Sequence, residues 1–135
     1  MKKIFFLFPL LSVFISCTFT KGEVPKPVQA CVADPVIHIV PVAIGDNFFN
    51  PASITIIAGD TVKWTYATGS SGHSSTCNGT GGSTLPSGGT TWDSGVLSSG
   101  GIYQTALSIP GNYTYICTIH GAAMSGTIIV KPRCQ

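Results

Sequence analysis

Hydrophobic and polar residues alternate in several short segments after residue 36, which is the pattern of β-strands with one buried face. The clearest case is Thr61–Tyr66, where either Val62, Trp64 and Tyr66 or the opposite set faces inward. No window shows the periodicity of an amphipathic helix. The expected strands cover residues 36–44, 53–57, 61–66, 102–109, 113–119 and 125–131.

Turn-forming residues separate these segments. Residues 68–91 are dense in glycine, serine and threonine, so we expect a long loop that contains one or two short strands. Pro110-Gly111 predicts a tight turn before the strand that follows. Many short strands at regular spacing predict an all-β fold, either a sandwich or a barrel.

The beginning of the chain has the pattern of an export signal. Two lysines precede an apolar run over residues 4–15, which is too short to span a membrane. We therefore expect residues 1–16 to be a signal peptide. Ser16-Cys17 resembles a bacterial lipoprotein cleavage site, which would make Cys17 a lipidated N-terminus; the alternative is ordinary signal cleavage nearby, with Cys17 removed.

The rest of the chain divides into a linker and one domain. Residues 17–35 are polar and contain prolines, which is typical of an extended tether. Residues 36–135 are enough for one domain with a single core. The sequence thus predicts an exported protein, located in the periplasm or anchored to the outer membrane of a bacterium as a lipoprotein.

Charge excludes some classes of partner. Two of the 7 Lys and Arg residues lie in the signal segment, and the other five are balanced by 5 Asp and Glu residues. A neutral and sparsely charged domain argues against nucleic acid as a partner, and against strong electrostatic steering of a protein partner.

Four side chains suggest a metal site. Cys117, His120 and Met124 lie in one short segment where two expected strands are joined, and His73 supplies a second imidazole from the long loop. Two imidazoles and a thiolate, with a thioether as a weak axial ligand, are the ligand set of a mononuclear copper site that changes between Cu(I) and Cu(II). The third histidine, His38, lies in the first expected strand and is interpreted as structural or solvent-facing.

Several motifs occur in the order found in one known family. The chain resembles the cupredoxins, the small blue copper proteins of the plastocyanin, pseudoazurin and amicyanin group, over roughly residues 36–131. The matching segments are Phe49-Asn50-Pro51, Gly59-Asp60-Thr61-Val62-Lys63-Trp64, Gly72-His73, Trp92-Asp93-Ser94-Gly95, Pro110-Gly111-Asn112-Tyr113-Thr114-Tyr115-Ile116-Cys117, His120 and Met124-Ser125-Gly126-Thr127-Ile128-Ile129-Val130.

The resemblance implies an eight-stranded Greek-key β-sandwich with one copper ion at one pole. Its ligands would be His73, Cys117, His120 and Met124. One departure is visible, because three residues separate His120 from Met124, whereas the plastocyanin-type loop usually has four and the amicyanin type two. This departure bears on the axial ligand and on the copper geometry.

The resemblance also implies a function. The chain would be a type 1 copper electron-transfer protein, a monomer that passes single electrons between transient redox partners. A copper-binding or copper-delivery protein without a carrier role is the alternative. An enzyme is not expected, since the copper enzymes of this fold need further domains and additional histidines, and His38 is the only histidine left over.

By the same resemblance, Ser74 and Thr118 would form hydrogen bonds that join the two ligand loops, and backbone N–H groups would point at the Cys117 sulfur. A flat apolar patch around His120 would receive the redox partner. The expected patch residues are Gly121, Ala122, Ala123, Leu85 and Pro86.

The remaining cysteines have separate expectations. If the fold is cupredoxin-like, Cys31 and Cys134 both lie at the pole away from copper, and a disulfide between them would close nearly the whole domain, although sequence alone does not fix the pairing. Cys77 would be a free thiol or part of a second metal site. An immunoglobulin-type core role for Cys117 needs a partner cysteine on a facing strand, and residues 35–63 contain none.

Overall fold

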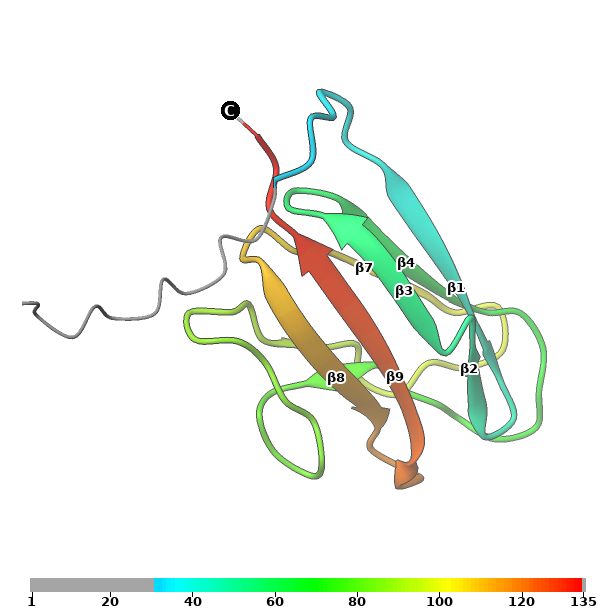
Figure 1. The fold of residues 1–135 in the computed structure, drawn as a ribbon. Coiled ribbons are helices and arrows are strands. Elements are labelled where there is room, and N and C mark those ends of the chain that lie inside the picture. Colours follow the sequence, from blue (N-terminus) through cyan, green and yellow to red (C-terminus); the bar gives the residue numbers. More distant parts are fainter. Residues whose placement is uncertain (1–30, 135) are drawn as a thin grey trace, which may run out of the picture.

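The computed structural model describes residues 31–134, in which nine strands form two sheets (Figure 1). The predicted signal peptide, Cys17 and most of the predicted tether lie outside the described residues. Among those described, no helix is long and apolar enough to cross a membrane. The predicted all-β sandwich is confirmed, with one strand more than the eight expected.

The two sheets contain four and five strands. The first has the order β2-β1-β4-β7, with β1 Ile39–Gly45, β2 Phe48–Asn50, β4 Thr61–Tyr66 and β7 Ile102–Ala106. The second has the order β3-β9-β8-β5-β6, with β3 Ser53–Ile57, β5 Thr76–Cys77, β6 Trp92–Asp93, β8 Gly111–Cys117 and β9 Gly121–Lys131. Because β1 pairs with β4 and β3 with β9 in parallel, the chain crosses between the sheets instead of forming only hairpins.

The strands follow the sequence pattern where the alternation is long. β3 and β4 coincide with the predicted segments, and Val62, Trp64 and Tyr66 form the inward set with 0% exposure each. The long loop contains the single short strand β5, as expected. β2 was not predicted, because three residues are too few to show alternation.

Aromatic side chains fill the core between the sheets. The Trp64 ring lies 5.6 Å from that of Trp92 and 5.3 Å from that of Tyr115, and Tyr115 also contacts Phe49 at 4.6 Å (ring centroids). These buried rings come from both sheets, so their packing fixes how the sheets face each other. The sandwich is therefore a rigid base for the loops at its ends.

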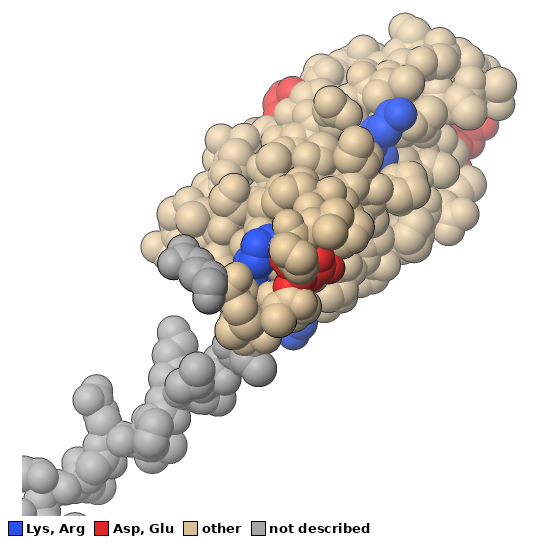
Figure 2. Space-filling view, turned by 90° about the horizontal axis from the view of Figure 1, so that it is seen from above, with Lys and Arg blue, Asp and Glu red and all other residues tan. Residues whose placement is uncertain are grey.

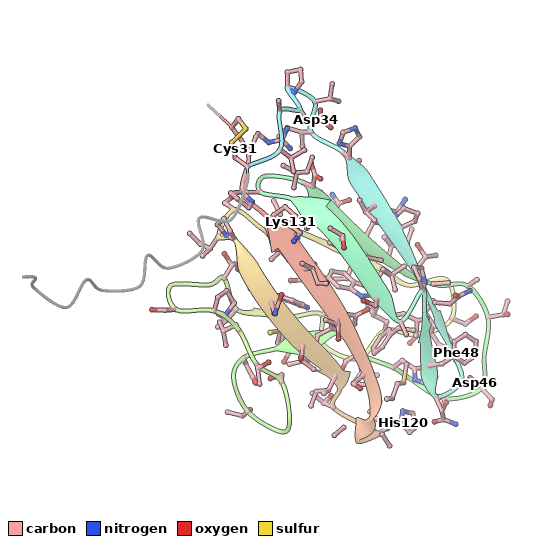
Figure 3. The ribbon with its side chains drawn as sticks, viewed as in Figure 1. Cys31, Asp34, Asp46, Phe48, His120 and Lys131 are labelled. Atoms are coloured by element: carbon pink, nitrogen blue, oxygen red, sulfur yellow. A yellow bond between two sulfur atoms is a disulfide. The ribbon has the colours of Figure 1, made fainter. Side chains whose placement is uncertain are left out.

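The two ends of the sandwich are chemically different (Figure 3). His120 lies at one end, near Asp46 and Phe48 of the hairpin that joins β1 to β2. The other end holds the disulfide Cys31–Cys134, whose Cα atoms are 5.1 Å apart. The disulfide expected from the resemblance is thus confirmed, and it lies at the end away from His120.

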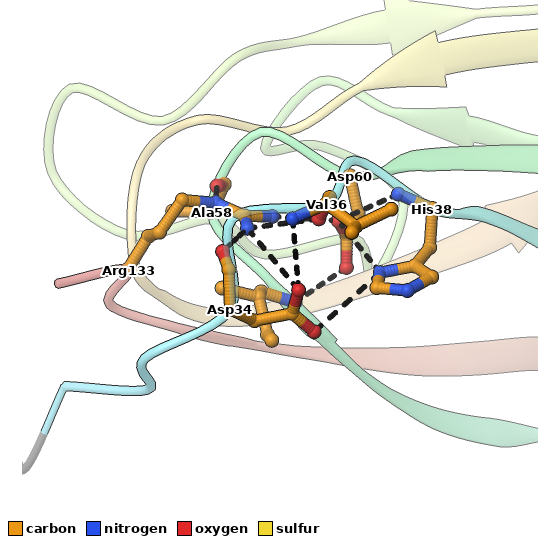
Figure 4. A network of polar contacts seen from close by, with 7 residues as sticks. Asp34, Val36, His38, Ala58, Asp60 and Arg133 are labelled. Carbon is orange, nitrogen blue, oxygen red and sulfur yellow. Dashed lines mark hydrogen bonds and ion pairs between the residues drawn. The ribbon is translucent and has the colours of Figure 1, made fainter.

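The disulfide end also contains a buried ion pair (Figure 4). The Arg133 guanidinium donates to the Asp60 carboxylate at 2.8 Å and to the Ala58 carbonyl at 2.9 Å. It also donates to the carbonyl of Asp34. These bonds attach the N-terminal segment and the β3–β4 turn to the C-terminal segment, on a surface that shows few other charges (Figure 2).

Asp60 is the centre of this network, and its side chain is almost fully buried. Burial would raise the pKa of its carboxyl group, but the N–H groups of Ile57 and His38 and the Arg133 cation outweigh burial, so the pKa is lowered. The His38 ring lies 3.6 Å from Asp60 and is about half exposed. His38 is therefore part of this network, in line with its expected structural role.

Candidate metal centre

Three of the four predicted metal-binding side chains converge in space. Nδ1 of His73 lies 3.9 Å from the Cys117 sulfur, and Nδ1 of His120 lies 3.4 Å from it. One ligand atom from each of the three residues lies within 4.8 Å of the other two. No other group of three or more histidine, cysteine or acidic side chains in residues 31–134 is close enough to hold a metal ion.

The end of β8 positions Cys117 and His120. Cys117 is the last residue of β8 and is fully buried, and the β8–β9 pairing becomes irregular at this point. The chain then turns so that the His120 N–H donates to the Cys117 carbonyl at 3.2 Å. Gly121 follows with φ of +60°, a conformation that glycine adopts without strain, and this allows β9 to begin directly after the turn.

The loop between β4 and β5 positions His73, whose side chain is 0% exposed. Its backbone pairs with Leu97 through hydrogen bonds of 3.2 and 2.7 Å. The Tyr66 ring meets the His73 ring edge to face at 4.8 Å, and the Tyr66 hydroxyl donates to the Ser71 carbonyl at 2.6 Å. These contacts hold the imidazole in one orientation before any ion binds.

Hydrogen bonds join the two ligand loops, as the resemblance predicted. The Thr118 N–H donates to the Ser74 hydroxyl at 2.9 Å, and the two hydroxyl groups are also 2.9 Å apart. The Ser74 N–H points at the Cys117 sulfur at 3.4 Å. A donor at this sulfur stabilises a thiolate, and it restricts the direction from which an ion can bind.

The fourth predicted ligand is Met124. It lies on β9, three residues after Gly121, which is the β9 partner of Cys117. Its side chain is 1% exposed and belongs to the buried core. The thioether is thus shielded from water on the strand that begins next to the Cys117 turn.

The remaining sequence candidates lie outside this cluster. Cys77 is buried, donates to the Thr84 carbonyl at 3.3 Å, and has a pKa raised to about 11 by burial. A thiol with such a pKa is not a reactive thiolate at neutral pH, so Cys77 is a free and inert thiol. Pro86 packs against Gly111 at the start of β8, far along the strand from Cys117, so its predicted place in an apolar patch around His120 is wrong.

Sequence reasoning missed two kinds of neighbour. The first is the Asp46 carboxylate, 3.4 Å from Nε2 of His73. The second is a pair of exposed apolar side chains, Val96 and Ile119, which both approach Gly72. A Cβ atom at position 72 would lie 2.5 Å from Val96 Cγ1, so the Val96 side chain packs closely over this glycine. These neighbours were missed because Asp46 is distant in sequence from His73, and Val96 and Ile119 are distant from Gly72.

The chemistry of the donors fits a copper ion. Two imidazole nitrogens and a buried sulfur with a hydrogen-bond donor beside it form a soft, nitrogen and sulfur set with the separation that a shared ion requires. Met124 adds a buried thioether. The site therefore fits one type 1 copper ion, and it offers no carboxylate oxygen ligands of the kind that Mg²⁺ or Ca²⁺ prefer.

Comparisons with known proteins agree with this chemistry. The model of the copper binding proteins of the plastocyanin/azurin family matches residues 38–131. A pseudoazurin from Sinorhizobium meliloti is 27% identical, with a TM-score of 0.58 over 73% of this chain and 77% of that chain. The oxidised plastocyanin from Dryopteris crassirhizoma is 31% identical, with a TM-score of 0.54 over 68% of this chain and 100% of that chain.

A copper-containing nitrite reductase from Thermus scotoductus is also similar, at 26% identity and a TM-score of 0.54. The match covers 78% of this chain but only 25% of the nitrite reductase chain. No curated protein sequence matches the chain. The family match spans both ligand loops and all nine strands of the described residues. The chain therefore belongs to the plastocyanin/azurin family of copper-binding proteins.

Proposed function

We propose that this protein carries single electrons between redox partners, using one copper ion bound by His73, Cys117 and His120, with Met124 as a weak axial ligand. The observation that carries this proposal is the convergence of three donors, within 4.8 Å of one another, from two loops on a rigid sandwich. Copper, when bound, supplies the one-electron change between Cu(II) and Cu(I).

The surrounding residues favour electron transfer because they restrict movement of the ligands. Ser74 and Thr118 tie the two loops together, and Tyr66 packs against the His73 ring. Ligands that are held in place change little between two oxidation states, so little energy is spent on rearrangement when an electron arrives or leaves. A hydrolytic site would instead need an open position for water.

The burial of the donors indicates where an electron would enter and leave. His73 and Cys117 are fully buried, and His120 is partly exposed. The surface beside them carries the exposed side chains of Ile119 and Val96. Ala122 and Ala123, at the start of β9, are also exposed. We propose this apolar surface around the His120 edge as the docking surface, where contacts would be small and transient.

The cellular setting is also a proposal. The apolar N-terminal run and Ser16-Cys17 support export, followed by residence in the periplasm or anchoring through a lipid on Cys17. The disulfide Cys31–Cys134 supports an oxidising compartment. The protein would act as a monomer, with redox proteins and not nucleic acid as its partners.

The position of His38 supports a carrier over an enzyme. A second copper centre needs further imidazoles, and His38 is tied to Asp60 and Asp34 at the opposite end of the sandwich. His38 is the one histidine of residues 31–134 outside the metal cluster, and a single imidazole does not supply a second copper centre.

Copper loading of the soluble domain, residues 31–135, tests this function. We expect an intense visible band from thiolate-to-Cu(II) charge transfer, and complete, reversible bleaching over repeated cycles of reduction and reoxidation. A weakly coloured protein that prefers Cu(I) and passes its copper to an apo-acceptor would contradict the carrier role and support copper delivery.

The axial role of Met124 has its own expected result. A Met124→Leu variant keeps the volume of the buried side chain and removes the thioether. We expect the colour to survive and the reduction potential to rise by on the order of 59 mV or more, a tenfold change in relative affinity, because the lost donor stabilised Cu(II) more than Cu(I). Cyclic voltammetry measures this shift, and an unchanged potential would assign Met124 to the core alone.

A further inference from the structure

The imidazole of His73 is engaged through both of its ring nitrogens. Nδ1 faces the Cys117 sulfur at 3.9 Å, and Nε2 faces away from it. Nε2 lies 3.4 Å from an Asp46 carboxylate oxygen and 3.3 Å from the Ser71 hydroxyl. Asp46 lies in the turn between β1 and β2, 27 residues before His73, and no sequence motif connects the two.

We propose that Asp46 is a positioning residue for the copper centre, which fixes the tautomer of His73 and adds a negative charge that favours the oxidised ion. This inference rests on the proposed function of the site. A carboxylate can only accept a hydrogen bond from neutral imidazole, so it selects the tautomer with the proton on Nε2. That tautomer leaves the lone pair on Nδ1, the nitrogen that faces Cys117.

The packing around Asp46 shows that this contact is part of the fold. The ligand loop closes over the β1–β2 turn at Gly69, where a Cβ atom would lie 2.8 Å from the same Asp46 oxygen. The same position faces the hydroxyl of Tyr66, whose ring packs against His73. Glycine at position 69 thus lets the loop approach closely enough for His73 to reach Asp46.

The sign of the charge effect follows from simple electrostatics. Cu(II) with one thiolate carries a net charge of about +1, whereas Cu(I) with one thiolate is about neutral. A nearby carboxylate therefore attracts the oxidised site and not the reduced one, which lowers the reduction potential. The Asp46 side chain is 59% exposed, so water screens its charge and the expected effect is moderate.

Two variants of Asp46 separate its charge from its hydrogen bond, and Asp34 provides a matched control. Asp46→Asn keeps an acceptor oxygen and removes the charge, while Asp46→Ala removes both. Asp34→Asn makes the same change in total charge at the opposite end of the sandwich (Figure 3). Competition titrations of the apo-proteins give Cu(II) and Cu(I) affinities, and thermal melts of the apo-proteins report stability.

For Asp46→Asn we expect the ratio of Cu(II) to Cu(I) affinity to fall about fivefold, a rise in potential of about 40 mV at 59 mV per tenfold change, with the apo-protein melting as the wild type does. For Asp46→Ala we expect Cu(II) affinity to fall about tenfold, the lower end of the range for an outer partner of a ligating histidine. Asp34→Asn should leave both affinities within about twofold of the wild type.

An unchanged affinity ratio in Asp46→Asn, or an equal shift in Asp34→Asn, would overturn the inference. If either variant gives such a result while the wild-type protein shows the blue band, the proposed electron-carrier function is not affected. A wild-type protein that binds copper without the band fails the proposed function instead, so the two failures are distinguishable.

Discussion

Replacing Cys117 with serine is expected to abolish the visible charge-transfer band and to lower Cu(II) affinity by more than about 100-fold, beyond the range seen when only an outer partner of a ligand is lost. The thiolate supplies both the colour and the one negative charge of the donor set. Serine has nearly the same volume, and its hydroxyl can accept from the Ser74 N–H that now points at the sulfur. The apo-variant should therefore fold and keep the same strands.

Cys77→Ser is the matched control for this experiment, because Cys77 is the other free cysteine of the described residues and is equally buried. Its thiol donates to the Thr84 carbonyl, a bond that a hydroxyl can also make. We expect the Cys77→Ser protein to retain its colour and copper affinity, as measured by absorption and competition titration. A band that survived in Cys117→Ser would remove the central ligand from the proposed site.

Residues that were predicted well share one property, which is that the signal lies in a single local segment. Cys117 and His120 are three positions apart in one turn, so their spacing already places both side chains at the end of β8. β3 and β4 were located because five or six alternating residues are enough to show a period of two.

Features that depend on tertiary placement were not predictable in the same way. Asp46 meets His73 only because β1 pairs with β4 in parallel, which brings the β1–β2 turn beside the loop that follows β4. Pro86 was placed near His120 by the family resemblance, but in the structure Pro86 packs against Gly111 at the start of β8. His73 was a candidate because the ligand set needs a second imidazole, but one histidine in a glycine-rich loop carries little information, and the family resemblance supported the assignment.

The pairing of Cys31 with Cys134 was predictable only in part. Several pairings of the five cysteines are compatible with the sequence, and only the expected fold placed these two at the same end. In the structure, Val32 pairs with the C-terminal segment on both sides of Arg133, through hydrogen bonds of 2.8 and 3.0 Å to Pro132 and Cys134. The disulfide therefore links segments that backbone hydrogen bonds already align.

Cys77→Ala serves as the reference for removing this disulfide, because it deletes a buried thiol without deleting a cross-link. Loss of a single small core group is expected to cost about 1 kcal/mol. Urea unfolding of the apo-protein gives the free energy, and also the slope of that free energy with denaturant, which reports the surface exposed on unfolding. Apo-protein is used so that copper binding does not add to the measured stability.

The double variant Cys31→Ala/Cys134→Ala is then expected to lose about 4 to 5 kcal/mol of unfolding free energy, because the disulfide closes a sequence separation of 103 residues and restricts the unfolded chain. The folded domain should be nearly unchanged, since Arg133 still binds Asp60 and the Ala58 carbonyl at the same end. The slope with urea should rise, because an unlinked chain exposes more surface when it unfolds. The visible band of the copper-loaded variant should match the wild type, as the disulfide lies at the end opposite to His120. A free energy within about 1 kcal/mol of the Cys77→Ala value would show that hydrogen bonds and the Arg133 ion pair hold the two ends without help from the cross-link.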